Sequence, residues 1–255
     1  MIRTSGAGRP LVFAHRGACK VAPENTMPAF EAAIRLGADG IELDVQHSSD
    51  GHLVVFHDLT LDGLTNGTGR VTAHPIGALR QLDAGSHFGA QYAGTRIPLL
   101  NEVLDLVRGK LPVNIELKVP QLNDAGLGAD VVSAVRDHDM ADDVVISSAN
   151  PFTVRNAKLA GPEIECALLV AHDLPGWMRW GSTRRYSRAD SIHPEAVMVD
   201  EKYTSWARSA GLSLRVWTVN EDAVFRRLSM LGIDAVFTDV PDRMLEIARS
   251  LETEV

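Results

Sequence analysis

The chain has 255 residues, of which 45% are hydrophobic and 23% charged, and its formal net charge is −8. These values are typical of a globular protein, and we predict a single domain over residues 1–255. The acidic charge argues against nucleic acid as a main partner, and no apolar run approaches the roughly 18 residues of a membrane span. Residues 1–15 lack the apolar run of a signal peptide, and Cys19 and Cys166 form no disulfide framework, so we expect a cytoplasmic protein. The sequence indicates no oligomeric state.

Short β-type runs alternate with helical patterns along most of the chain. The runs that we predict to be strands are 11–15, 41–45, 53–57, 113–117, 144–148, 165–170, 196–200, 214–219 and 235–239. Residues 28–36 show helical spacing and stop at Gly37, and Asn220 is the expected N-cap of a helix that ends at Gly232. Strands that alternate with helices indicate βαβ units and a parallel sheet.

The third run does not fit this alternation. The second and third runs are too close in sequence for a crossover helix, which needs a dozen or more residues. Asp50-Gly51 between them is instead a hairpin signal. We therefore predict that 53–57 returns antiparallel on the second strand, which brings His57 to about the height of Asp44. The remaining eight runs give a TIM (β/α)8 barrel, and residues 58–98, rich in Gly, Thr and His, give a small insertion over its C-terminal mouth.

Acidic residues gather at the predicted ends of two barrel strands. Glu42 and Asp44 are two positions apart and point to the same side of their strand, and Glu116 and Lys118 repeat this spacing at the end of the next parallel strand. Strand ends at the C-terminal face carry the active sites of such barrels. Three carboxylates there favour a hard cation such as Mg²⁺, Ca²⁺ or Mn²⁺. The alternative is a set of solvated acids paired with lysine or arginine.

Histidines and basic residues approach the same strand ends. His15 and Arg16 close the first strand, and His57 returns through the hairpin. Histidine can act as a general acid or base near neutral pH. Arg16 and Lys118 could grip a phosphate or pair with the acids. Trp217 could form a wall of the site, although strand parity does not show which face is inward.

Nine short motifs, in order along nearly the whole chain, resemble the glycerophosphodiester phosphodiesterase family. They are HRG (15–17), PENT (23–26), AF (29–30), GADGIELDVQ (37–46), SDGHLVVFHD (49–58), TNGTG (65–69), NIELK (114–118), VWTVN (216–220) and FTDVP (237–241). The resemblance implies a TIM barrel with a small insertion after its His-Asp motif. It also implies one divalent cation, Mg²⁺ or Ca²⁺ with Mn²⁺ also open, on Glu42, Asp44 and Glu116.

The same resemblance assigns the other candidate residues. It implies that His15 and His57 are the catalytic acid/base pair, that Arg16 and Lys118 bind the phosphate, and that Trp217 lines the substrate pocket. The implied activity is metal-dependent hydrolysis of small glycerophosphodiesters to glycerol 3-phosphate and an alcohol.

Two other functions stay open at this point. Trp177, Met178 and Trp180 follow the strand that ends near Val170, so they could contact the acyl chain or choline group of a lysolipid. This would give an activity similar to lysophospholipase D. The second alternative is an inactive barrel that binds a phosphorylated ligand.

Overall fold

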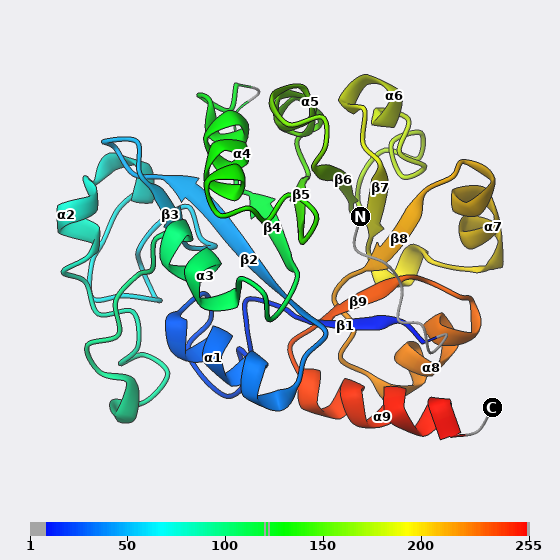
Figure 1. Ribbon diagram of the computed structural model, residues 1–255, viewed down its shortest axis with the longest axis horizontal. Helices are drawn as coiled ribbons and strands as arrows, with labels where there is room; N and C mark the ends of the chain where they lie inside the picture. The colour runs from blue at the N-terminus through cyan, green and yellow to red at the C-terminus, as the bar shows by residue number, and fades with distance from the viewer. Residues whose placement is uncertain (1–8, 120, 122, 254–255) are drawn as a thin grey trace.

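The computed structural model describes residues 9–119, 121 and 123–253, and these form a closed parallel barrel with helices around it (Figure 1). The sheet order is β1-β9-β8-β7-β6-β5-β4-β2, and the pairing of β1 with β2 closes it. The predicted TIM barrel is therefore confirmed. Its strands are β1 (Leu11–Ala14), β2 (Gly40–His47), β4 (Val113–Leu117), β5 (Val144–Ser148), β6 (Glu165–Val170), β7 (Ser191–Pro194), β8 (Ser213–Val216) and β9 (Ala235–Thr238).

The outer helices bury one apolar side against these strands. They are α1 (Met27–Leu36), α3 (Leu100–Val107), α4 (Leu127–Asp137), α5 (Pro151–Ala160), α6 (Arg184–Ser187), α7 (Glu201–Ser209), α8 (Asp222–Met230) and α9 (Pro241–Thr253). In α1, Phe30 and Ala33 are fully buried, and Gly37 ends the helix at a φ of 75°, as its sequence predicts.

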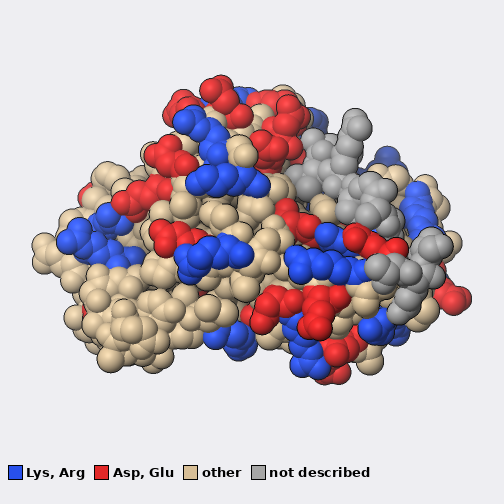
Figure 2. All heavy atoms as spheres, turned by 60° about the horizontal axis from the view of Figure 1, so that its bottom comes forward, with Lys and Arg blue, Asp and Glu red and all other residues tan. Residues whose placement is uncertain are grey.

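The surface over α9 carries charges of both signs side by side, as Figure 2 shows. Arg9 illustrates the pattern, because its guanidinium lies 2.6 Å from Asp39 and 2.7 Å from Glu252 of α9. No helix in the described ranges is long and apolar enough to cross a membrane. The predicted lack of a signal peptide concerns residues 1–15, and residues 1–8 lie outside the described part of the chain.

The hairpin on the second barrel strand is present. β3 (Leu53–Val55) runs antiparallel to β2, with Val45 opposite Val55 and His47 opposite Leu53. Gly51 makes the turn at a φ of 81°, which suits glycine. The amide of Phe56 then donates to the carbonyl of Asp44 at 2.9 Å, so the chain delivers His57 beside the end of β2.

Residues 58–98 form the insertion at the β3 side of the barrel (Figure 1). It contains the short elements η1 (Val71–Ala73), α2 (Ile76–Leu79) and η2 (Ala90–Tyr92). A small apolar cluster of its own, separate from the barrel core, holds it against β3. The buried members are Val54, Phe56, Leu61, Val71, Leu79, Ala84 and Ile97.

Two predictions about local structure are wrong. The seventh barrel strand is β7 at Ser191–Pro194, whereas residues 196–200 enter the short helix η3 (Ala196–Met198). β7 turns polar Ser191 and His193 inward, so it lacks the apolar pattern that marked the other strands. Asn220 does not cap α8; Glu221 holds that position, because the Asn220 side chain bonds Thr238 and Asp239 across the sheet.

Candidate active site

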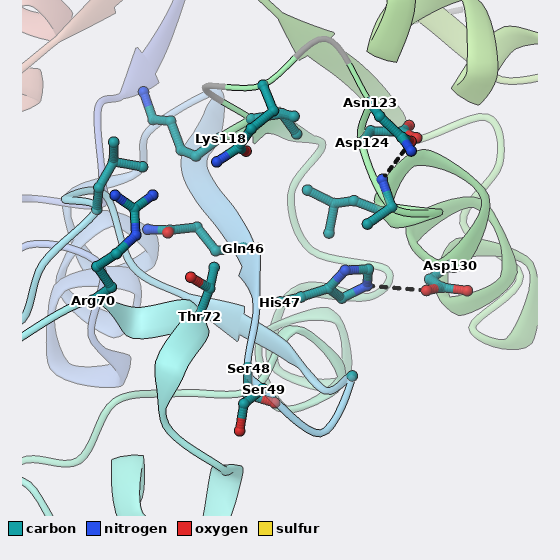
Figure 3. A pocket seen from close by; sticks show the side chains of 16 residues that line it. Gln46, His47, Ser48, Ser49, Arg70, Thr72, Lys118, Asn123, Asp124 and Asp130 are labelled. Carbon is teal, nitrogen blue, oxygen red and sulfur yellow. Dashed lines mark hydrogen bonds and ion pairs between the residues drawn. The ribbon is translucent and has the colours of Figure 1, made fainter.

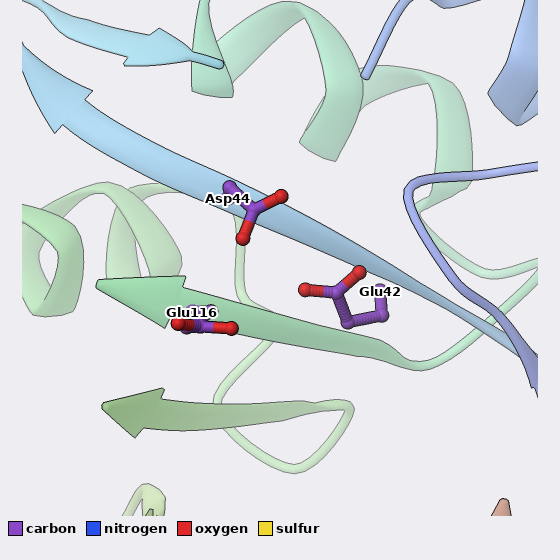
Figure 4. Close-up of side chains that lie close together, drawn as sticks. All are labelled: Glu42, Asp44 and Glu116. Carbon is purple, nitrogen blue, oxygen red and sulfur yellow. The ribbon is translucent and has the colours of Figure 1, made fainter. Parts of the chain in front are cut away.

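Three carboxylates converge at the C-terminal ends of β2 and β4. Glu42 and Asp44 project from β2 toward Glu116 of β4, and one oxygen of each lies within 4.8 Å of the others (Figure 4). The strand register explains this, since Asp44 pairs with Glu116 and Glu42 is two residues earlier on the same face. Glu42 and Asp44 are buried. The predicted triad is therefore assembled.

The charges in this triad are strongly coupled. Burial, followed by the negative charge of Asp44, raises the pKa of Glu42 to about 8. Burial would also raise the pKa of Asp44, but Lys118, His57 and Arg16 outweigh it and hold that pKa at about 2. Burial raises the pKa of Glu116 as well, against the opposing charge of Lys118. Two of three acids thus resist ionisation, as expected where like charges meet out of water.

The donor set of this triad fits a hard divalent cation. All its donors are carboxylate oxygens, which suit Mg²⁺, Ca²⁺ or Mn²⁺ better than zinc. Asp44 Oδ1 is buried and accepts no hydrogen bond from the residues that the structure describes, although Lys118 Nζ lies 3.1 Å away. A buried carboxylate oxygen in this state leaves a coordination position available. A cation would offset the repulsion that raises the pKa of Glu42.

His15 lies on one side of the triad and is held by an aspartate. Its Nδ1 is 2.7 Å from Asp239 Oδ1, and its Nε2 is 3.9 Å from Glu42. Asn220 fixes the second oxygen of Asp239 through a hydrogen bond of 2.8 Å. Burial would lower the pKa of His15, but the bond to Asp239 and the charge of Glu42 raise it above its ordinary value. The ring therefore has one nitrogen anchored and the other facing the triad.

His57 has an equivalent partner in the adjacent residue. Its Nδ1 lies 2.7 Å from Asp58 Oδ1. The backbone that carries this pair is clamped by Gln46 of β2, whose Nε2 donates to the carbonyls of Phe56 at 2.9 Å and Asp58 at 2.7 Å. The hairpin and one amide together set the position of the second histidine.

The two predicted phosphate ligands, Arg16 and Lys118, lie beside the acids. Arg16 adopts a φ of 56°, which turns its amide to Glu42 at 2.9 Å, and its guanidinium bonds Glu24 at 2.8 Å. Lys118 Nζ lies 2.5 Å from Glu116 and 3.1 Å from Asp44. Both cations thus pair with acids, as the alternative interpretation predicted, and both also line the cavity described next.

A cavity of about 340 Å³ is lined by both histidines, both cations, Glu42 and Glu116, and it continues into the other half of the barrel. Its apolar wall comes from β6, β8, β9 and the loop after β6, and consists of Leu169, Ala171, Leu174, Trp217 and Phe237. Trp217 is thus inward-facing, and its Nε1 donates to the carbonyl of His193 at 2.7 Å.

A shallower groove of about 460 Å³ lies outside the barrel, between the hairpin, the insertion and α4. Figure 3 shows Gln46, Arg70 and Thr72 on one side of it, and the His47–Asp130 pair, 3.0 Å apart, nearby. Lys118 lines both the groove and the cavity. The groove therefore adjoins the site, but it contains none of the three clustered carboxylates.

Some residues of the site were not singled out from the sequence. Asp58 and Asp239 follow His57 and a strand end, so the His-Asp and Thr-Asp dipeptides were usable signals. Asn25 donates to Asp44 at 2.8 Å from within the PENT motif. His193 had no signal, because its strand was not recognised.

The fold and site define a phosphoric diester hydrolase of the TIM-barrel class, and comparison with known proteins gives the family. A profile of the glycerophosphoryl diester phosphodiesterase family matches residues 15–243. The chain belongs to this family.

Relatives of similar length support this assignment. A glycerophosphodiester phosphodiesterase of Caldanaerobacter subterraneus is 38% identical over 94% of this chain and 98% of that protein. One from Bacillus altitudinis is 35% identical over 94% and 99%. Among solved structures, an Oleispira antarctica phosphodiesterase in complex with the product sn-glycerol-3-phosphate has a TM-score of 0.83 at 30% identity, over 94% of this chain and 96% of that one. A glycerophosphodiester phosphodiesterase from Agrobacterium tumefaciens gives 0.81 at 32%, over 93% and 99%.

Proposed function

We propose that the chain hydrolyses glycerophosphodiesters to glycerol 3-phosphate and an alcohol, using a divalent cation and a histidine acid/base pair. One observation carries this proposal. His15 and His57, each anchored through Nδ1 to an aspartate, line one cavity together with Glu42 and Glu116 of the carboxylate cluster. Family membership and the product named for the Oleispira relative support the same reaction.

Glu42, Asp44 and Glu116 would hold the cation in this proposal. When bound there, a divalent ion supplies charge stabilisation to the nonbridging oxygens of the phosphate. Arg16 and Lys118 add positive charge at the same rim of the cavity. Assay of purified protein with Mg²⁺, Ca²⁺ or Mn²⁺ after chelation identifies the ion. No restored activity with any of the three would contradict a metal-dependent reaction.

The histidines move the protons. One takes the proton of the nucleophile, which is water or the neighbouring glycerol hydroxyl, and the new phosphorus–oxygen bond forms. The bond from phosphorus to the other alcohol breaks, and the second histidine protonates the departing oxygen. Asp239 and Asp58 bind Nδ1 of His15 and His57, which leaves Nε2 of each ring to take or give the proton. Full turnover of a 2-deoxy diester would exclude attack by the neighbouring hydroxyl.

The test is release of glycerol 3-phosphate from glycerophosphocholine by His15→Ala and His57→Ala. Each should fall roughly a hundredfold or more, because positioned acid/base groups contribute about that much. His138→Ala, a change at a histidine outside the cavity, is the control. Near-normal rates in either site variant would remove that residue from the pair.

A p-nitrophenyl diester distinguishes the acid from the base. Its leaving group needs no proton, so the variant that lacks the general acid should recover most of its rate on this substrate. The variant that lacks the base should stay slow. Equal recovery by both variants would contradict the division of roles.

A lysophospholipase D-like activity is the second candidate. Trp177 is 65% exposed in the loop after β6, near Leu174 of the cavity wall. Trp180 is less available, since it stacks on Tyr203 at 5.2 Å. Turnover of lysophosphatidylcholine at a rate comparable to that of glycerophosphocholine, lowered by Trp177→Ala, would favour this activity. No turnover of lysophosphatidylcholine, or turnover that Trp177→Ala leaves unchanged, would remove this second candidate.

We also propose that residues 1–255 act as one domain in a reducing compartment such as the cytoplasm. Cys19 and Cys166 are both free thiols. Fractionation of cells that produce the tagged chain tests the location, and a single cooperative unfolding transition tests the domain assignment.

A further inference from the structure

His193 is a buried polar side chain that the proposed chemistry does not use. It projects inward from β7 and is fully buried, yet it lines the cavity. Neither ring nitrogen has a hydrogen-bond partner among the described residues. Its neighbours are the ring of Phe237, with centroids 5.3 Å apart, and the Trp217 side chain, which bonds its backbone carbonyl.

Asn114 is the second such group. It projects inward from β4 and is buried, and its Nδ2 donates to Ser147 at 3.0 Å. Its Oδ1 is buried without a hydrogen-bond partner in the described part of the chain. Asn114 also lines the cavity, so two unsatisfied side chains from separate strands face one space.

Such groups rarely stay unpaired in folded proteins. A buried donor or acceptor without a partner destabilises the folded state, so it usually meets water or a ligand. Burial, followed by the charge of Arg215, lowers the pKa of His193 well below its ordinary value, and the imidazole is therefore neutral. A neutral imidazole offers one donor and one acceptor, and the Asn114 carbonyl offers a further acceptor. A hydroxyl group, which both donates and accepts, matches this set.

The strand register sets the level of Asn114 in the barrel. Asn114 pairs with Glu42, whereas Asp44 and Glu116 pair two residues nearer the strand ends. β7 is separated from β4 in the barrel by β6 and β5, so His193 faces the cavity from another side. A substrate whose phosphate lies at the triad would extend its glycerol unit toward Asn114 and His193.

We propose that Asn114 and His193 form a hydroxyl-binding subsite that takes the terminal hydroxyl of the glycerol unit, the one farthest from the phosphate. The subsite makes the enzyme select diesters of polyols over diesters of simple alcohols. This inference rests on the proposed function, because it assumes that the phosphate binds at Glu42, Asp44 and Glu116.

The test compares two diesters that differ only in this hydroxyl: glycerophosphocholine and the choline diester of propane-1,2-diol 1-phosphate. Both keep the hydroxyl next to the phosphate ester. Wild-type protein should prefer the first by about 100-fold or more in kcat/KM, since a site built to bond a hydroxyl rejects analogues without it. In His193→Phe and Asn114→Leu, this preference should fall to within about threefold, mainly because kcat/KM for glycerophosphocholine falls. His193→Gln, which keeps a donor and an acceptor, should retain part of it.

His138→Phe, a change at a buried histidine outside the cavity, is the matched control and should keep the full preference. If His193→Phe does not fold, His193→Gln and Asn114→Leu decide the question. A wild-type preference near one, or an unchanged preference in folded variants, would overturn the subsite.

A binding measurement separates this inference from the proposed function. The affinities of glycerol 3-phosphate and propane-1,2-diol 1-phosphate are compared by calorimetry, which needs no turnover. If the wild-type protein hydrolyses neither diester, the proposed function fails. The subsite then stands if glycerol 3-phosphate binds about tenfold or more tightly and His193→Phe removes the difference, and it falls if the two bind equally.

Discussion

The two halves of the barrel contribute different chemistry to one cavity. β1, β2 and β4 supply the charged groups, with the carboxylates and histidines gathered at their ends. β6, β8 and β9 supply an apolar wall that includes Leu169, Trp217 and Phe237. Below that wall, the charged groups Glu165 and Arg215 satisfy each other, with N–O distances of 2.6 and 3.1 Å.

The two halves differ in how their buried charges are compensated. In the first half, burial and the nearby charge of Asp44 together raise the pKa of Glu42. In the second half, the buried carboxylate of Glu165 and the buried guanidinium of Arg215 neutralise each other. We infer that the first half sets the rate of the reaction, whereas the second half supports the barrel and contributes to substrate binding. Five predictions test this contrast.

The largest effect is expected from Glu42→Gln. Cation binding is worth several kcal/mol to a phosphoryl transition state, so kcat should fall about a thousandfold or more. The metal-free variant should at the same time unfold at a higher temperature than the metal-free wild type, because one member of a repelling buried set is gone. Glu31→Gln, an equal charge change on the exposed side of α1, is the control. A lower melting temperature in the variant would contradict the idea of repelling charge.

Arg215→Met should instead lower the stability of the protein. It leaves Glu165 buried without its partner, which destabilises a protein by about 3–5 kcal/mol. Arg35→Met on exposed α1 should cost far less. The double variant Glu165→Leu/Arg215→Met should regain most of the lost stability. Urea unfolding measures all three, and a loss below about 1 kcal/mol in Arg215→Met would remove the structural role of the pair.

The same pair predicts a pH dependence. Burial alone would raise the pKa of Glu165, but the charge and hydrogen bonds of Arg215 outweigh it and lower that pKa below its ordinary value. A group with a lowered folded-state pKa contributes stability above its unfolded pKa and loses that contribution as pH falls through the folded pKa. As the pH falls below about 4, the free energy of unfolding of the wild type should therefore decrease more than that of the Glu165→Leu/Arg215→Met variant.

The sequence predicted the charged half better than the apolar half. Glu42, Asp44 and His57 follow from strand parity and one turn, which are local rules that the barrel preserves. The Asp50-Gly51 turn made the fold-back predictable before any three-dimensional information. β7 was misplaced because its inward residues, Ser191 and His193, are polar, and only tertiary packing shows that they fill the barrel.

The anchors of the two histidines show the same limit. Asp58 is adjacent to His57 in sequence, so it was within reach of a local argument. Asp239 contacts His15 only because β9 pairs with β1 across the barrel closure. Asn220 illustrates the converse, since a plausible helix cap is diverted to Asp239 by a contact 19 residues away.

Asp239→Asn tests the anchor in the charged half, with an intermediate effect. The amide keeps the shape but weakens the hold on the His15 tautomer, so kcat should fall roughly tenfold to a hundredfold, as for other residues that orient a working ligand. KM should stay within about twofold, and Asp239→Glu should restore part of the rate. Asp242→Asn, on the exposed first turn of α9, is the control. A variant with reduced stability but normal kcat would show that Asp239 serves the fold alone.

Trp217→Phe should give the smallest effect, and it tests the apolar half. The substitution keeps an aromatic wall but removes the indole N–H that bonds the His193 carbonyl at 2.7 Å. Without this bond the ring is less firmly held in the cavity wall, so KM should rise, by up to about fivefold if the roughly 1 kcal/mol of one hydrogen bond is lost from substrate binding, while kcat stays within about twofold. Trp206→Phe changes a tryptophan that packs against Trp180 and does not line the cavity, so it should alter neither constant. If Trp217→Phe instead lowered kcat with KM unchanged, the division between a reacting half and a binding half would fail, because an apolar wall residue would then be acting in the transition state.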